Sequence, residues 1–163
     1  MILRVAPLLL FLALCSCVPA GPPAPIPLDV PALSAAAAAL PGVRIDSVDP
    51  LSLSYPDEVL FARGAALPLP GGPALLDPLA SLLAAHPRGR WNGTVRSAGG
   101  VSPDYDLALA EKRRELLERY LRLRGVPADL VTLAAVAAEG PPLELWLQTD
   151  QGMNSATSTG VKP

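Results

Sequence analysis

A capped amphipathic helix in the second half of the chain is the strongest constraint on its fold. Ser102 supplies an N-cap oxygen, Pro103 suits the first helical turn, and Gly125 is a typical residue for ending a helix. The apolar side chains between them recur at helical spacing on one face: Leu109, Leu116, Leu117, Tyr120 and Leu121. This pattern predicts a helix with one buried stripe, which has to pack against another layer.

On both sides of this helix, shorter segments have apolar residues either at every second position, as in strands, or at helical spacing. Apolar residues at every second position predict strands within residues 43–55, at 91–96, at 131–136 and at 143–147. A leucine-rich segment from Leu75 to His86 has helical spacing, although Pro78 has to lie in its first turn or distort its start. The order strand, helix, strand, helix, strand, strand predicts an α+β fold: a two-layer sandwich of a mixed sheet with both helices on one face.

The N-terminal segment has the pattern of an export signal. A positively charged start precedes an apolar run from Val5 to Leu14, which is shorter than the roughly 20 residues of a membrane span. The run ends in the sequence Leu14-Cys15-Ser16-Cys17, which resembles a bacterial lipobox, where a small residue precedes the acylated cysteine. We therefore expect a signal peptide over residues 1–16 and a lipid on Cys17.

Two other interpretations of this segment stay open. Acylation of Cys15 is a competing register, in which the bulky Leu14 stands where lipoboxes have a small residue. An ordinary cleaved signal with two incidental cysteines is the other alternative. Each of these takes the chain out of the cytoplasm. By resemblance to lipoproteins of Gram-negative bacteria, Val18 in place of an aspartate after Cys17 favours the outer membrane.

Composition divides the rest of the chain into a spacer, a domain and a tail. Residues 18–31 contain six prolines, which predicts an extended spacer of polyproline type. The alanine-rich segment 34–39 favours helical turns but has no apolar stripe, so we assign it to the linker. The last thirteen residues are small and polar. We expect a lipid-anchored linker at 17–42, a folded domain at 43–150 and a disordered tail at 151–163.

Charge and residue counts exclude several classes of function. The chain has 13 Lys and Arg against 15 Asp and Glu, so it has no basic footprint for DNA or RNA. One His and two Cys are too few for the clusters that hold zinc or iron, and we expect neither metal nor cofactor. No motif for a catalytic nucleophile or an acid pair is present, so we expect a protein that is not an enzyme.

The segment from Tyr105 to Arg114 resembles the OmpA-like peptidoglycan-binding domain. The family pattern Asn-x-x-Leu-Ser-x-x-Arg-Ala falls on this segment with Leu109 and Arg113 in agreement, while the Asn, Ser and Ala positions depart from it. Residues 55–61 and 124–128 resemble the family as well, and the resemblance extends over residues 43–149. It implies an OmpA-like two-layer sandwich.

The resemblance also implies a ligand, the diaminopimelate side chain of the cell-wall stem peptide. That side chain ends in an ammonium and a carboxylate on one carbon, so its receptor needs an anion and a guanidinium fork. The resemblance assigns the fork to Arg113, and Asp106 is a second candidate contact. The family's aspartate falls on Ala98, and Arg96 stands where the family has histidine. The alternative for Arg113 is a surface arginine of the helix, paired with Asp106 or Glu111.

These residues support two different functions. The first is an outer membrane lipoprotein facing the periplasm, which tethers or contacts peptidoglycan through Arg113. Its binding is weak or altered, because losing one member of a buried charged pair typically costs about 2 to 5 kcal/mol. The second is an interaction module that has lost peptidoglycan binding and whose partners are other envelope proteins. A lipid-anchored enzyme would need carboxylates or hydroxyls that converge in a cleft.

Overall fold

One five-stranded mixed sheet organises the part of the chain that the computed structural model describes, residues 28–56 and 59–148. The elements follow in the order α1 (Val30–Ala38), β1 (Arg44–Val48), β2 (Leu51–Tyr55), α2 (Gly72–Ala85), β3 (Trp91–Ser97), α3 (Pro103–Leu123), β4 (Val131–Ala137) and β5 (Leu143–Leu147). The strand order across the sheet is β1-β2-β5-β3-β4, and of these neighbouring pairs only β3 and β4 are parallel.

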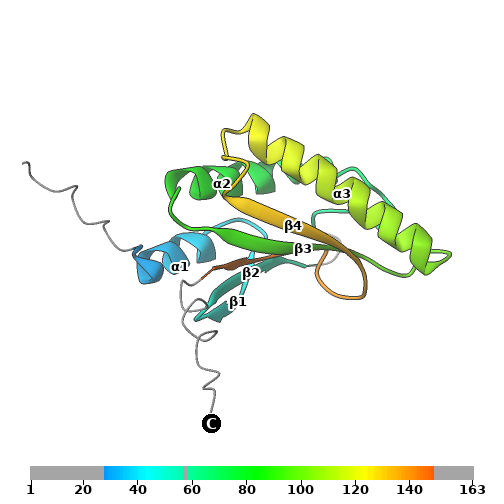
Figure 1. Cartoon of the computed structure of the whole chain (residues 1–163), viewed down its shortest axis with the longest axis horizontal. Coiled ribbons are helices and arrows are strands. Elements are labelled where there is room, and N and C mark those ends of the chain that lie inside the picture. Colours follow the sequence, from blue (N-terminus) through cyan, green and yellow to red (C-terminus); the bar gives the residue numbers. More distant parts are fainter. Residues whose placement is uncertain (1–27, 57–58, 149–163) are drawn as a thin grey trace, which may run out of the picture.

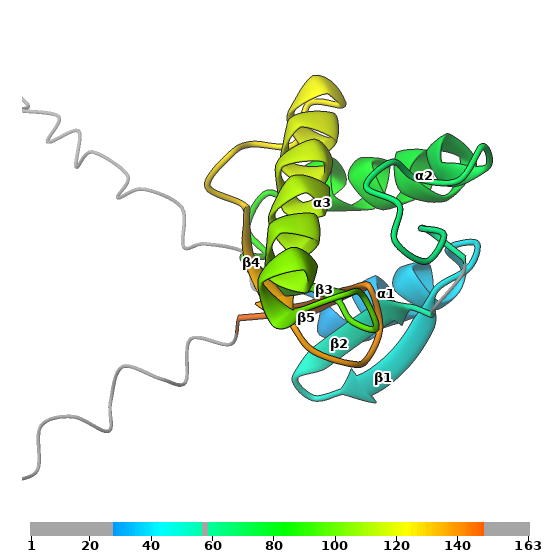
Figure 2. The same cartoon turned by 90° about the vertical axis from the view of Figure 1, so that its right-hand side faces the viewer.

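Helices α2 and α3 lie over the same face of this sheet (Figure 1). Helix α3 packs on β3 and β4 (Figure 2). The predicted α+β class, with a mixed sheet and two helices on one face, is confirmed.

Helix α3 has the caps and the buried stripe that its sequence predicts. The Ser102 hydroxyl accepts a 3.2 Å hydrogen bond from the amide of Tyr105, and Gly125 has a φ of 84° just beyond the last turn. That φ lies in the left-handed region, where glycine is favoured. The apolar residues of the buried stripe are Leu109, Ala110, Leu117 and Leu121, whereas Leu116 and Tyr120 of the predicted stripe are half-buried.

Helix α2 begins earlier than its leucine pattern predicts. It starts at Gly72 with Pro73 in the first turn, so Pro78 lies inside the helix. The expectation that Pro78 lies in the first turn or distorts the start is therefore wrong. The buried side of the helix still carries the leucines, including Leu76, Leu79 and Leu83.

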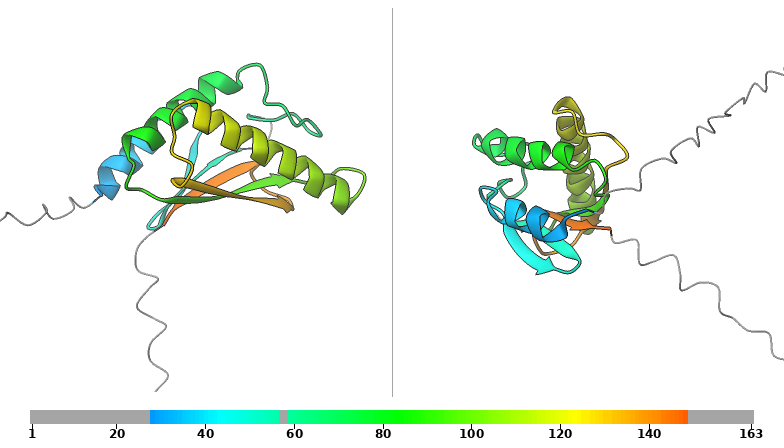
Figure 3. Two further views of the ribbon diagram at one scale, coloured as in Figure 1. Left: turned by 45° about the horizontal axis from the view of Figure 1, so that its top comes forward. Right: turned by 90° about the vertical axis from the view of Figure 1, so that its left-hand side faces the viewer.

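Helix α1 corrects the predicted boundary between linker and domain. We expected residues 17–42 to be linker, but residues 30–38 form a helix that lies against β1, β2 and α2 (Figure 3). The Asp29 carboxylate caps it by accepting a 3.0 Å hydrogen bond from the amide of Ala32. Leu33 and Ala37, one turn apart, are 1% and 0% exposed and belong to the core. The folded unit therefore begins before residue 43.

The inner face of the sheet is packed so closely that one strand position requires glycine. A Cβ on Gly93 would lie 2.4 Å from a methyl group of Leu145 and 2.7 Å from one of Leu133, its partners on the flanking strands. On the outer face, Arg96 and Glu144 form a 2.6 Å ion pair between β3 and β5. Because side chains alternate along a strand, β3 contributes residues both to the core and to the outer face of the sheet.

The predicted signal peptide, Cys17, most of the proline-rich spacer and the tail at 151–163 lie outside the described residues. Among the helices at 28–56 and 59–148, none has the length and apolarity needed to cross a membrane.

Candidate functional site

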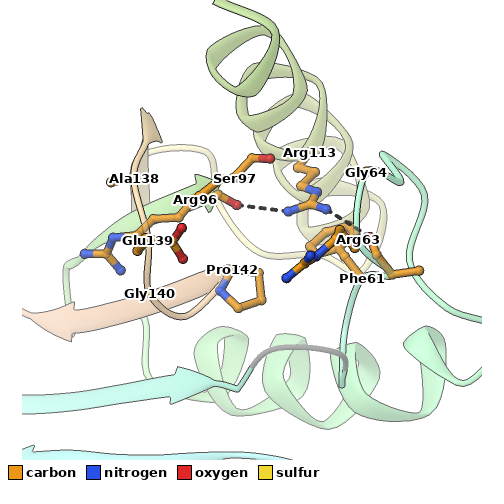
Figure 4. A pocket seen from close by; sticks show the side chains of 12 residues that line it. Phe61, Arg63, Gly64, Arg96, Ser97, Arg113, Ala138, Glu139, Gly140 and Pro142 are labelled. Carbon is orange, nitrogen blue, oxygen red and sulfur yellow. Dashed lines mark hydrogen bonds between the residues drawn. The ribbon is translucent and has the colours of Figure 1, made fainter. Parts of the chain in front are cut away.

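A pocket opens at the edge of the sheet where β3 and β4 end (Figure 4). Because these strands are parallel, the loops that follow them leave at the same edge, and Ala138 donates a 3.1 Å backbone hydrogen bond to Ser97. The cavity has a volume of about 210 Å³ and is lined by residues 61–64, 96–98 and 138–140 together with Arg113 and Pro142. It is smaller than the roughly 300 to 1,000 Å³ of drug-sized sites, and suits the end of a side chain.

Arg113 reaches this pocket from the middle of α3 and is 5% exposed. Its Nε, Nη1 and Nη2 atoms donate to the carbonyl oxygens of Ala65 at 2.8 Å, Arg96 at 3.0 Å and Ala62 at 3.1 Å. Its guanidinium carbon lies 4.6 Å from the centre of the Phe61 ring, within range of a cation–π contact. These contacts fix the guanidinium between the 61–65 loop and the end of β3.

The alternative of a surface arginine is wrong, because Arg113 lies on the buried stripe of α3. It is one turn from Leu109 and one turn from Leu117, which are 6% and 2% exposed. The helix therefore points Arg113 inward, where backbone carbonyls surround it.

Asp106 lies two turns before Arg113 and has a different set of contacts. It is 8% exposed, and both of its carboxylate oxygens accept from the amide of Gly100, at 3.1 and 3.2 Å. A Cβ on Gly100 would lie 2.5 Å from this carboxylate, so a larger residue there would displace the Asp106 side chain. Asp106 is not among the described residues that line the pocket, and the structure does not bring it together with Arg113. Its contacts shape the loop between β3 and α3.

The position of the family's aspartate is part of the pocket wall, and it carries only a methyl group. Ala98 lines the cavity, as does Arg96, which lies two residues earlier on β3. The guanidinium of Arg96 turns away from Arg113 (Figure 4) and pairs with Glu144. Arg96 therefore offers Arg113 its carbonyl oxygen, while its positive charge is compensated on the other face of the sheet.

Solved structures with the same arrangement of helices and strands come from bacterial envelope proteins. The periplasmic domain of Helicobacter pylori MotB has a TM-score of 0.55 at 16% identity, with 70% of this chain and 83% of that chain covered. An outer membrane protein from Borrelia burgdorferi gives 0.55 at 15% identity, with 66% and 97% covered. The cell wall anchor of the T6SS from Pseudomonas aeruginosa gives 0.54 at 15% identity, with 72% and 95% covered. The chain has an OmpA-like fold.

This OmpA-like fold is the one that the segment from Tyr105 to Arg114 predicts. No model of a protein family matches the sequence, and no curated protein matches it either. The similarity is therefore carried by the arrangement of the OmpA-like elements rather than by a shared sequence.

Two charged residues of the OmpA-like pocket escape the sequence analysis. Arg63 and Glu139 are both exposed and both line the cavity. Glu139 follows β4, and the signal that would find it is the strand–helix–strand order of β3, α3 and β4. A crossover of that kind makes the two strands parallel and brings the loops after them to one edge of the sheet. No group of three or more His, Cys, Asp or Glu side chains that could hold a metal ion occurs within 28–56 and 59–148.

Proposed function

We propose that this chain is a non-catalytic protein of the cell envelope whose OmpA-like domain binds the stem peptide of peptidoglycan. The observation that carries the proposal is the buried Arg113 in a pocket the size of a side-chain terminus. A guanidinium presents its donors in a rigid fork that matches a carboxylate, and a cavity wall strengthens such a contact by excluding water.

The contacts of Arg113 prepare it for this task. Three hydrogen bonds to backbone carbonyl oxygens hold the guanidinium in one orientation at the pocket. Because the orientation is set before a ligand arrives, little conformational entropy is lost on binding. The distal carboxylate of diaminopimelate is the ligand group that we assign to Arg113. The T6SS cell wall anchor has the same fold, which supports a wall ligand for this chain.

The anchor is the second part of the proposal. We propose that the chain is exported, acylated on Cys17 and held at the outer membrane with its domain in the periplasm. The support is the apolar run from Val5 to Leu14, the small Ser16 and the absence of aspartate at Val18. Lipid at one end and peptidoglycan at the other would make the protein a tether of the envelope.

A different function is favoured by Ala98. Without a carboxylate at that position the site lacks the family's partner for the ligand ammonium, and the domain would then be an interaction module for other envelope proteins. The two functions differ in whether the isolated domain recognises the cell wall.

Sedimentation with intact sacculi tests the proposal. The purified domain, residues 28–148, is mixed with sacculi whose stem peptide contains diaminopimelate, and with sacculi that contain lysine instead. Lysine keeps an ammonium but lacks the distal carboxylate, so the domain should pellet with the first and much less with the second. Pelleting with neither would favour the interaction module, and equal pelleting with both would contradict the assignment of Arg113 to the distal carboxylate.

A further inference from the structure

Glu139 lies across the pocket from Arg113, on the loop between β4 and β5 (Figure 4). We propose that Glu139 replaces the carboxylate that is missing at Ala98 and binds the ammonium group of the ligand. This inference rests on the proposed function, because it names the second contact of the same ligand.

The register of the parallel strands brings the two positions together. Ser97 is paired with Ala137, and the next residues, Ala98 and Ala138, both line the pocket. Glu139 follows directly. Adjacent strands are roughly 4.8 Å apart, so side chains leaving the ends of β3 and β4 reach the same space. A carboxylate from either loop therefore serves the same end of the cavity.

The charges around the cavity are separated in a way that suits such a ligand. Arg113 and Arg63 stand on the side opposite Glu139 (Figure 4). Glu139 is the carboxylate among the described lining residues, and none of the ion pairs found at 28–56 and 59–148 involves it. Arg96 is paired with Glu144 on the outer face, and so does not compete for Glu139. Opposite charges on two walls favour a zwitterion over a simple anion.

The loop that carries Glu139 is held by its neighbours. Gly140 has a φ of 121°, a left-handed conformation that favours glycine. Gly140 packs against the Arg96 side chain: a Cβ on Gly140 would lie 3.4 Å from Cδ of Arg96. Pro142 accepts a 3.1 Å hydrogen bond from the amide of Arg96. The ion pair of Arg96 and this hydrogen bond therefore support the turn next to Glu139.

Two synthetic tripeptides separate the role of Glu139 from a general effect on the pocket. The first is Ala-γ-Glu-diaminopimelate, and the second has 2-aminopimelate at the third position, which keeps the distal carboxylate and lacks the ammonium. Binding to the domain, residues 28–148, is followed by NMR titration. Glu139→Gln should weaken binding of the first peptide by about tenfold and leave binding of the second unchanged. Glu111→Gln, the same change on an exposed position of α3, should affect neither.

The outcomes distinguish this inference from the function on which it rests. If wild type binds the diaminopimelate peptide and Glu139→Gln binds it equally well, the inference is wrong and the function stands. If Glu139→Gln weakens both peptides to the same degree, Glu139 does not recognise the ammonium, and the inference is overturned again. If wild type binds neither peptide, the proposed function fails and the inference fails with it.

Discussion

Arg113 donates a 3.0 Å hydrogen bond to the carbonyl oxygen of Arg96, and the two guanidinium groups point to opposite faces of the sheet. The strand end thus holds two cations that do not compete for one ligand. Arg96 is compensated by Glu144 at 2.6 Å, while Arg113 lies in the pocket. The Arg96 guanidinium is therefore directed to Glu144 and not to the ligand that we assign to Arg113.

Replacing Arg113 should destabilise the fold as well as the site. Arg113→Ala leaves the carbonyl oxygens of Ala62, Ala65 and Arg96 without this donor, and we expect the free energy of unfolding to fall by about 2 to 4 kcal/mol. Arg114→Ala, which removes a half-exposed pair with Glu118, should cost about 0 to 1 kcal/mol. Urea unfolding measures both. Equal stabilities would mean that Arg113 does not anchor the 61–65 loop.

A carboxylate restored at residue 98 should strengthen binding. Ala98→Asp adds a partner for the ligand ammonium beside Glu139, and we expect sacculus binding to rise by up to about tenfold. Competition from Arg63 and Arg113 for the new carboxylate limits the gain. Ala98→Asn has nearly the same shape without the charge and serves as the control. A gain of the same size in Ala98→Asn, or no gain in either variant, would contradict the role of charge at this wall.

The glycine in the middle of β3 should be irreplaceable. In Gly93→Ala the new methyl would lie 2.4 Å from Leu145 and 2.7 Å from the backbone oxygen of Glu144, which cannot move without disturbing the sheet. We expect a loss of about 3 kcal/mol or more in unfolding free energy. Gly71→Ala, where a Cβ meets nothing within 4 Å, should be close to neutral. Thermal unfolding of the two variants compares the positions directly.

Stability should decline at alkaline pH. Burial raises the pKa of the Tyr55 phenol, and desolvation followed by the hydrogen bond to Asp77 raises the pKa of Tyr120. The folded state holds both protons, so this stability is complete below the ordinary tyrosine pKa of about 10 and is lost as the pH rises through the raised values. Phenols titrate at roughly pH 8 to pH 12, so the unfolding free energy should be measured over that range. It should fall above about pH 10.

Phenylalanine at position 55 provides the control for that pH profile. Tyr55→Phe loses the 3.0 Å hydrogen bond to the carbonyl of Leu75, which lowers stability near neutral pH by about 1 kcal/mol. Its decline above about pH 10 should be shallower than that of wild type. An unchanged slope would assign the alkaline loss to other groups.

Mass spectrometry of the mature N-terminal peptide tests the anchor. We expect an acylated cysteine at residue 17, because Ser16 is the small residue before it. Cys15→Ser should leave the lipid in place, whereas Cys17→Ser should release the protein from the membrane fraction. Acylation that survives in Cys17→Ser would assign the lipid to Cys15.

Strong periodicity made most of the fold predictable, and its absence explains what was missed. Helix α3 follows from Ser102, Gly125 and a leucine stripe, each of which acts locally. Helix α1 presents Leu33 and Ala37 to the core among other alanines, so its buried face differs little in composition from its exposed face. A buried helix face can be predicted from sequence only when its residues differ from those of the exposed face, and here the residues of both faces are mostly small and apolar.

The site was less predictable because its residues meet only through the topology. The resemblance pointed to Arg113, but the carbonyl oxygens that hold it come from residues 62, 65 and 96, and the 61–65 loop has no period. From the sequence alone, Glu139 is predicted to be part of the turn between two strands. Its place opposite Arg113 depends on the parallel pairing of β3 with β4, which is a long-range property of the chain.

Helix α1 sets the reach of the proposed tether. If the lipid is on Cys17, twelve residues separate it from Val30, the first residue of the helix. Fully extended, that length spans at most about 43 Å, roughly half of what a linker ending at residue 42 would allow. The docked helix therefore shortens the reach of the pocket from the membrane, which is at most the length of this linker plus the extent of the folded domain beyond Val30.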